Sequence, residues 1–498
     1  MTLQTVPSSK SDILSGFKHS KLGMTGIIIF ILLVGTSIYT VTSIPLTSFR
    51  QWNSPSYWVD YPAAAAPSWT NLGLFGPTAA VHTILSSESG KEKVSEQTYR
   101  GVHIVSNSYT TNYGYDSYPT DFMIPYSVRY GAIPPILEIN VTRPDGHEFR
   151  IYYSALPSNA IEKNREGNNQ QVGDKVQVMD VPQEYDSSSE QQSEYSSRVF
   201  STDREISQNL RQYTSLFKYS PDVTRPQIML FSDTQVNEIL KGPYTFKLTF
   251  YFFDNQDVVE ETRVILGGTV YGFLGTDAFR RDLAIGILWG TPVALFIGLT
   301  VAIATSFIAM IYGITAGYKG GRVDEVMMRI NDFFISLPVL ILLILLSVRY
   351  GLNLYLIVTL LILFGWAGGA RLIRSISLQI KNLQYVDASK MMGESDLKII
   401  FRHIVPQLLP LTFATIAYSV PGAILAEAGL SLLGLSDLSI PSWGRILNEA
   451  NSASATTLGL WWWIIPPGIM IGLTGLSFAL IGYTLEHITN PRRARKYI

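Results

Sequence analysis

The sequence contains no cysteine, and only 15% of its 498 residues are charged. The lack of cysteine excludes disulfide bonds and cysteine-ligated metal sites. Positive charge is not in excess either, because the formal net charge is −1. A protein that neutralises nucleic-acid phosphates needs a basic surface, which this composition does not supply. The sequence therefore predicts that nucleic acid is not a partner.

The motifs of several enzyme classes are also missing. Gly90 and Lys91 are followed by Glu92 and lack an upstream glycine, so they do not form a phosphate-binding loop. The six histidines show no metal-ligand spacing, and no His-Glu-x-x-His occurs. The apolar runs hold no Ser/Lys or paired Asp arrangement of the kind that an intramembrane protease needs. The prediction is a chain that is not an enzyme and binds no cofactor or metal itself.

Long apolar runs are abundant. Hydrophobic residues make up 47% of the chain and the mean hydropathy is +0.18, which is too apolar for an ordinary soluble protein of this size. A hydrocarbon core of ~30 Å requires about 20 apolar residues in a helix. Six runs meet this requirement: 22–44, 285–317, 330–348, 352–370, 411–435 and 462–486. The first is too long for a signal peptide and no small-residue cleavage site follows it, so we interpret it as an uncleaved anchor.

Lysine and arginine predict the orientation, because they favour the cytoplasmic ends of spans. With the N-terminal segment 1–21 inside, the inner segments collect most of these residues, whereas the short outer loops hold only Arg349 and Arg445. The basic tail 491–498 is then cytoplasmic as well. This topology places the long segment 45–282 outside the cell membrane.

The segment 45–282 is long enough to form a domain of its own. Five of its runs have the β-branched and aromatic composition of strands: 136–141, 149–154, 227–231, 244–253 and 258–266. The run 183–197 is rich in Ser, Gln and Glu, which is typical of a solvated loop. The predicted fold class is an α-helical integral membrane protein with an inserted, mostly β extracytoplasmic domain. Its membrane core comprises 22–44 and 283–490.

A polar segment, 371–410, separates the fourth and fifth runs. Within it, 386–392 is expected to form a short helix, and Gly393 permits a turn with positive φ. Apolar residues then recur at helical spacing from Leu397 to Ile404. Two short helices at an angle are predicted at the inner membrane surface. Such a structure is either a passive connection or a surface that a partner recognises.

This segment resembles the EAA loop of ABC importer permeases. That loop has an acidic-Ala-Ala start, a glycine six residues after the acidic residue and an Ile-x-Pro end; here the spacing is kept, with aspartate for the usual glutamate and serine for the second alanine. In the family, the loop forms a coupling helix that docks on the ATP-binding subunit. The resemblance implies that the coupling residues are Asp387, Ala388, Ser389, Gly393 and Pro406.

Four further segments are similar to the dipeptide/oligopeptide branch of these permeases. The segment 274–282 reads Leu-Gly-Thr-Asp-Ala-Phe-Arg-Arg-Asp, with Arg280 where the branch has glycine, and the other three are 318–325, 423–435 and 441–444. The resemblance covers about 273–493 and the first run. It implies a type I ABC importer transmembrane domain with six helices, which imports a di- or oligopeptide by alternating access. The implied partners are a second related permease, one or two ATP-binding subunits that hold ATP and Mg, an extracytoplasmic solute-binding protein and membrane lipid.

Glu427 is an ionisable residue well inside the fifth run. An unpaired charge there costs at least ~2.5 kcal/mol, so the side chain should face other helices or a wet cavity. One interpretation is a polar lining of the translocation path or a gate. The other is a structural hydrogen bond near the outer boundary.

A different class of protein also fits the composition, namely a membrane-anchored receptor or adhesion module whose large outer domain is the functional part. The discriminating feature is the segment 385–406. A simple anchor has no reason to keep a coupling-loop pattern on its inner face.

Overall fold

The computed structural model describes residues 17, 20–71, 78–87, 92–131, 133–157, 193–350, 353–435, 437 and 439–489. These residues form two compact units. The first, the helical unit, comprises Met1–Tyr57 and Arg281–Ile498, and the second, the β domain, comprises Trp58–Arg280. The predicted tail 491–498 and most of the predicted N-terminal segment 1–21 lie outside the described residues.

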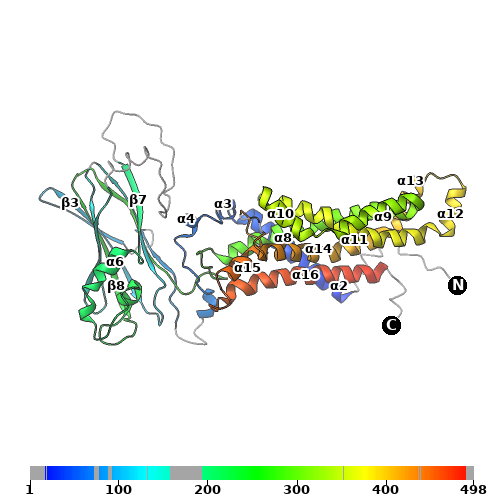
Figure 1. The fold of residues 1–498 in the computed structure, drawn as a ribbon. Coiled ribbons are helices and arrows are strands. Elements are labelled where there is room, and N and C mark those ends of the chain that lie inside the picture. Colours follow the sequence, from blue (N-terminus) through cyan, green and yellow to red (C-terminus); the bar gives the residue numbers. More distant parts are fainter. Residues whose placement is uncertain are drawn as a thin grey trace, which may run out of the picture. The chain divides into compact units, whose positions relative to one another are not determined.

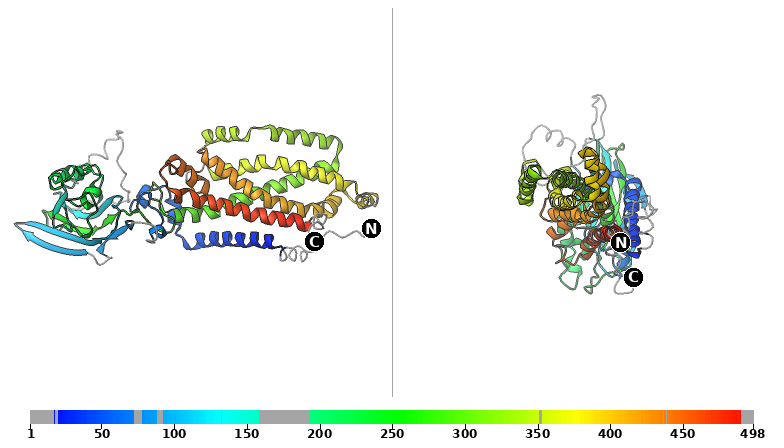
Figure 2. Two further views of the ribbon diagram at one scale, coloured as in Figure 1. Left: turned by 90° about the horizontal axis from the view of Figure 1, so that it is seen from below. Right: turned by 90° about the vertical axis from the view of Figure 1, so that its right-hand side faces the viewer.

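The helical unit contains long helices that run side by side (Figure 1 and Figure 2). In the described part of the chain, five helical runs are long and apolar enough to cross a membrane: Lys21–Ser43, Leu283–Lys319, Leu354–Lys381, Asp396–Leu432 and Trp461–Ile488. The helices are α2 (Lys21–Ser43), α3 (Leu46–Arg50), α4 (Pro55–Trp58), α8 (Leu283–Lys319), α9 (Gly321–Ser336), α10 (Val339–Tyr350), α11 (Leu354–Lys381), α12 (Gln384–Met391), α13 (Asp396–Ile399), α14 (Val405–Leu432), α15 (Trp443–Ser452) and α16 (Trp461–Thr489).

The predicted span 330–348 is not one helix. Helix α9 ends at Ser336 and α10 begins at Val339, because Leu337 is extended (φ −72°, ψ 132°) before Pro338. A residue before proline is pushed out of the helical region by the proline ring, which explains the break. The predicted run 330–348 is therefore divided between α9 and α10. Among the described residues, five helices rather than six are long and apolar enough to cross a membrane alone.

Small residues let the long helices pack closely. A Cβ atom added at Gly313 of α8 would lie 2.6 Å from the carbonyl oxygen of Ala370 on α11, and one at Gly317 would lie 2.8 Å from that of Arg374. Glycine at these positions allows the two backbones to approach, as is common between membrane helices.

The chain between α2 and the β domain adds two short helices, and α3 belongs to the helical unit. The Trp289 indole of α8 donates to the Ser48 hydroxyl (3.2 Å) and its ring lies 4.9 Å from that of Phe49. The compact β domain comprises Trp58–Arg280, a narrower range than the predicted segment 45–282.

The β domain consists of two five-stranded antiparallel sheets. One sheet has the order β1-β10-β4-β7 with β9 also paired to β4, and the other has the order β2-β3-β8-β5-β6. The strands are β1 (Thr83–Leu85), β2 (Glu92–Tyr99), β3 (Val102–Tyr113), β4 (Phe122–Tyr130), β5 (Ile136–Thr142), β6 (Glu148–Ala155), β7 (Ser193–Phe200), β8 (Gly242–Phe252), β9 (Val258–Thr262) and β10 (Val264–Leu266). Among the described residues, the strands are accompanied by helices α6 (Arg204–Arg211) and α7 (Pro226–Phe231).

Both sheets contribute side chains to one buried cluster, so the domain is a β-sandwich. Tyr126 of one sheet meets Phe250 of the other with ring centroids 6.0 Å apart. Inward-facing residues alternate with outward-facing ones in β5, as the two-residue period of a half-buried strand requires.

The strand predictions are confirmed in part. The runs 136–141, 149–154 and 244–253 correspond to β5, β6 and β8, and the run 258–266 is divided into β9 and β10 at Arg263. The strand predicted over 227–231 is wrong, because these residues form helix α7 with Pro226 in its first turn. The loop predicted over 183–197 is wrong at its end, where β7 begins at Ser193, and 183–192 lie outside the described residues.

Candidate functional site

The turn predicted at Gly393 is present. Helix α12 ends at Met391, and Gly393 has a φ of +80°. The Glu394 N–H donates to the Ser389 carbonyl oxygen (3.2 Å) and the Gly393 N–H donates to that of Lys390 (3.1 Å). This pair of bonds is the Schellman motif, which ends a helix at a left-handed residue. An added Cβ at Gly393 would meet no atom within 4 Å, so the positive φ, rather than lack of space, favours glycine.

Helix α12 exposes one face and buries another. Val386 and Ser389 are buried, whereas Asp387, Ala388 and Met391 are exposed. The predicted coupling residues therefore differ in exposure and in position. Ser389 is buried, and Pro406 lies in the first turn of α14 rather than in the turn at Gly393. The exposed face of α12 carries a carboxylate beside an apolar surface that extends to Met392, which is 78% exposed.

A polar network that the sequence did not reveal fixes the turn against the next helix. His403 lies in the π-helical turn Ile400–Ile404 between α13 and α14, and its Nε2 is 3.0 Å from a Glu394 carboxylate oxygen and 3.3 Å from the Ser389 hydroxyl. Lys398 adds an ion pair to Glu394 at 3.2 Å. The hydrogen bond with His403 holds the pKa of Glu394 below its usual value. The end of α12 is thus connected by side chains to the helical run that continues into α14.

Glu427 on α14 is buried and hydrogen-bonded. One of its carboxylate oxygens accepts from the Ser431 hydroxyl (2.8 Å) and from the Ser442 hydroxyl (2.7 Å). Ser442 is also the N-cap of α15, where its oxygen accepts from the Arg445 N–H. These contacts match the structural interpretation of Glu427 as the residue that connects α14 to the start of α15. Its role in a translocation path stays a prediction.

A second buried cluster lies where α8 begins. The side chains of Arg281 and Arg445 are each 5% exposed, and both contact the carboxylate of Glu449 on α15. Arg281 donates to both carboxylate oxygens (2.5 and 3.3 Å), and the Arg445 Nε donates at 2.9 Å. Arg445 also donates to Asn53, and the Arg281 guanidinium lies over the Trp52 ring at 4.7 Å. This charge cluster ties α15 to α8 and to the segment after α3.

Two guanidinium groups, those of Arg281 and Arg445, contact the single carboxylate of Glu449. Burial lowers the pKa of Arg445, and the nearby Glu449 carboxylate acts in the opposite direction. Arg281 lies in the motif 274–282, but the sequence assigned no role to it or to Glu449. The sequence shows only that these charged residues lie next to apolar runs. Their pairing is seen only in the folded structure.

Helix α15 is further attached to α8 through Trp443. Its indole N–H donates to the Ile287 carbonyl oxygen (3.0 Å), and an added Cβ at Gly290 would lie 2.4 Å from the Trp443 ring. Within the helical unit, α12 lies at one end of the long helices and α15 at the other (Figure 1). The Glu394 network and the charge cluster therefore hold opposite ends of the same bundle.

Known proteins resemble this part of the chain. The sequence model of the family described as "Binding-protein-dependent transport system inner membrane component" matches residues 309–495. The dipeptide transport system permease protein DppC of Bacillus subtilis is 39% identical over 224 residues, which are 45% of this chain and 69% of that protein. The oligopeptide transport system permease protein OppC is 35% identical in Bacillus subtilis (44% of this chain, 72% of that protein) and 34% identical in Haemophilus influenzae (45% and 71%).

The family match contains all the predicted coupling residues as well as Glu427, and it does not extend to the β domain. Each of these three permease proteins is more than 30% identical to the chain over more than two thirds of its own length. The chain therefore belongs to the family of binding-protein-dependent transport system inner membrane components, the permease subunits of ABC importers.

Proposed function

We propose that the chain imports di- or oligopeptides across the cell membrane by alternating access. The observation that carries this proposal is the exposed face of α12, which ends in the Gly393 turn inside the region that matches the permease family. The choice of peptide as substrate is supported by the relatives, which are permease proteins of dipeptide and oligopeptide transport systems. The proposal favours transport over the receptor or adhesion alternative.

In this mechanism the exposed face of α12 docks on an ATP-binding subunit that holds and hydrolyses ATP with Mg. A second related permease completes the membrane assembly within the lipid, and a solute-binding protein delivers the substrate. A movement of α12 is transmitted to α14 by the contact between Glu394 and His403. It is transmitted from α14 to α15 by the hydrogen bond between Glu427 and Ser442. Rigid side-chain contacts of this kind can pass a displacement along a helix bundle.

The proposed topology has six crossings with both chain ends in the cytoplasm. Helix α10 has 12 residues and is about 18 Å long, which is too short for the hydrocarbon core. We infer that α9 and α10 together make the sixth crossing. The β domain is then extracytoplasmic, and α12 with its neighbouring Lys390, Lys398 and Arg402 is cytoplasmic.

The transport function predicts loss of peptide uptake when the chain is removed. Cells that lack only this chain should not accumulate a radiolabelled dipeptide, and expression of the chain should restore uptake. A matched control expresses the chain together with an ATP-binding subunit whose phosphate-loop lysine is replaced, and this control should not restore uptake. Undiminished uptake without the chain, combined with loss of surface adhesion, would support the receptor alternative.

The topology predicts opposite labelling of two introduced cysteines. The native chain has none, so Gln208→Cys in α6 of the β domain and Ser395→Cys after the Gly393 turn each give a single thiol. Both positions are exposed. In intact cells an impermeant thiol reagent should label only the first, and both should react after permeabilisation. Labelling of Ser395→Cys in intact cells would reverse the orientation.

A further inference from the structure

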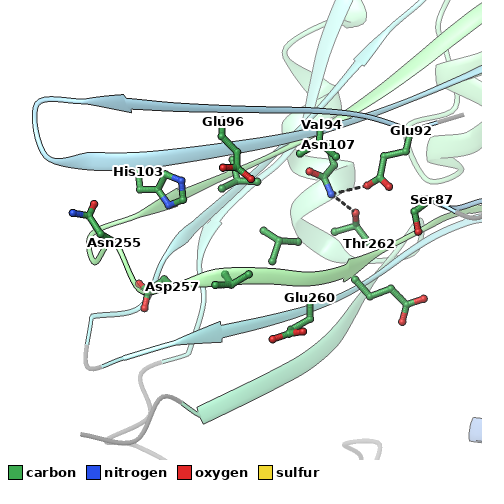
Figure 3. A pocket seen from close by; sticks show the side chains of 14 residues that line it. Ser87, Glu92, Val94, Glu96, His103, Asn107, Asn255, Asp257, Glu260 and Thr262 are labelled. Atoms are coloured by element: carbon green, nitrogen blue, oxygen red, sulfur yellow. Dashed lines mark hydrogen bonds between the residues drawn. The ribbon is translucent and has the colours of Figure 1, made fainter. Parts of the chain in front are cut away.

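The β domain contains a cavity of about 340 Å³ between the edges of its two sheets (Figure 3). Strands β2 and β3 form one wall and β9 forms the other. Among the described strands, β2 is at the edge of its sheet and β9 pairs only with β4. Val94 and Glu96 of the β2 wall are exposed, so a ligand can enter the cavity from the solvent.

The register places the side chains of Val94 and Glu96 in β2 on the inner face of the sheet. Val94 is paired with Asn107 and Glu96 with Val105, and directly paired residues share one face. Asn107 and Val105 are buried, which identifies this face as the inner one. Val94 nevertheless remains 55% exposed. The hydrophobic core thus ends at β3, and the inner face of β2 is left open toward the cavity.

Five acidic side chains and no lysine or arginine are among the described residues that line the cavity. Glu260 is paired with Arg129 and Glu261 with Arg263. Three other carboxylates, those of Glu92, Glu96 and Asp257, face the cavity without a Lys or Arg ion pair within the part of the chain that the structure describes. The cavity therefore attracts a positive charge.

Within the described residues, two buried oxygen atoms in the cavity wall have no hydrogen-bond donor. Asp257 is 1% exposed; one carboxylate oxygen accepts from the Gly131 N–H at 3.0 Å, and the other, Oδ2, finds no partner in the described part of the chain. Asn107 is 6% exposed, and its Nδ2 donates to Glu92 and Thr262 (2.8 Å each), which leaves its Oδ1 as a fixed, unpaired acceptor. Leaving a buried acceptor unpaired is unfavourable, so both atoms point to a ligand that donates hydrogen bonds.

We propose that this cavity binds a protonated primary amine carried on a short apolar chain. An ammonium group has three donors and no acceptor, which suits the unpaired carboxylate oxygen of Asp257 and the unpaired amide oxygen of Asn107. Figure 3 shows Asp257 near His103 and Asn255 at one end of the cavity, and Asn107 near Glu92 and Thr262 at the other. Valine side chains between these ends give an apolar surface for the carbon chain. The volume is at the lower end of the range for small-molecule sites.

A bare metal ion fits the cavity less well. Within the described residues, no group of three or more His, Asp or Glu side chains is placed to hold one. The amine can come from the amino terminus of a short peptide or from an alkylamine, which share this chemistry. The inference rests on the β domain alone and is independent of the proposed transport function.

The test is isothermal titration of the purified full-length chain in nanodiscs of a zwitterionic phosphatidylcholine. The probes are valyl-alaninamide, its N-acetyl derivative, n-butylamine and calcium chloride. The C-terminal amide avoids repulsion between a peptide carboxylate and the acidic cavity. Valyl-alaninamide should bind, and N-acetylation should weaken binding at least tenfold. Binding of n-butylamine as well supports any small amine as ligand, whereas binding of the peptide amide alone supports the peptide amino terminus.

Variants locate the binding to this cavity. Glu96 is exposed, so Glu96→Gln should leave the fold intact and weaken amine binding about threefold to tenfold. Asp257→Asn should weaken it more, and the control Glu148→Gln, at the opposite edge of the same sheet, should change nothing. The proposal is overturned if no amine binds, if only calcium binds, or if binding is unchanged in both Glu96→Gln and Asp257→Asn. The last result would place the amine elsewhere in the chain and leave the transport function unaffected.

Discussion

Glu449→Ala is expected to lower the free energy of unfolding of the helical unit by about 3–5 kcal/mol. The substitution leaves the guanidinium groups of Arg281 and Arg445 buried without the carboxylate that they share. Each guanidinium group then loses this carboxylate in a site where its side chain is only 5% exposed. Breaking one partner of a buried ion pair costs far more than the pair itself contributes.

The effect is measured by unfolding the purified chain in mixed micelles with increasing SDS. Glu325→Ala is the matched control, because Glu325 also pairs with an arginine, Arg329, but at 62% and 77% exposure. This exposed pair should contribute no more than about 0.5 kcal/mol. Glu449→Gln keeps a hydrogen-bond acceptor and should fall between the two. Equal unfolding of Glu449→Ala and Glu325→Ala would show that the charge cluster does not hold α15 to α8.

The long helices could be predicted because length and composition are local properties. The break at Pro338 was not predicted, although the proline is visible in the sequence, since hydropathy does not register the backbone restriction that proline places on Leu337. The charged residues of α9 were a second indication that the region is not one apolar helix. They make Gly321–Ser336 amphipathic rather than uniformly apolar.

In the β domain, the runs that contain β5, β6, β8, β9 and β10 were recognised, whereas β2, β3 and the aromatic strand β4 were not. Strands β2 and β3 are rich in Ser, Thr, Asn and Glu, and most residues of β2 are exposed. What holds them is pairing with distant residues, such as Ser106 with Thr249. The short run 227–231 had a strand's composition, but Pro226 starts a helix there.

In the candidate site, too, local features could be predicted and contacts between distant residues could not. The turn at Gly393 could be predicted because it depends on one glycine and its immediate neighbours. The contact between Glu394 and His403 needs the helix that begins at Asp396 to fold back, and the contact between Arg281 and Glu449 joins residues 168 positions apart. Pairings of this kind arise from packing, and a single sequence holds no direct record of them.

Gly393→Val is expected to reduce ATP-driven peptide uptake more than it reduces membrane insertion. A β-branched residue at a φ of +80° is opposed by about 1–2 kcal/mol, which shifts the equilibrium of the turn about fivefold to thirtyfold. The cost remains local, because the added atoms meet nothing within 4 Å at Cβ. What changes is the direction of α12, whose exposed face is proposed to dock on the ATP-binding subunit. Gly393→Asn is the matched control, since asparagine tolerates the left-handed region better than other residues and should retain most of the uptake.

Asp387→Lys tests the same surface by charge instead of conformation. Asp387 is exposed in the first turn of α12, so the lysine reverses the charge of the proposed contact and is also unfavourable at a helix N-terminus by about 0.3–1 kcal/mol. Because exposed charges are screened by salt, its effect should depend on ionic strength, whereas that of Gly393→Val should not. Uptake and co-purification of the ATP-binding subunit are measured together and normalised to permease in the membrane. If Gly393→Val and Asp387→Lys both transport and co-purify like the unaltered chain, α12 is only a connection between helices and the proposed coupling is wrong.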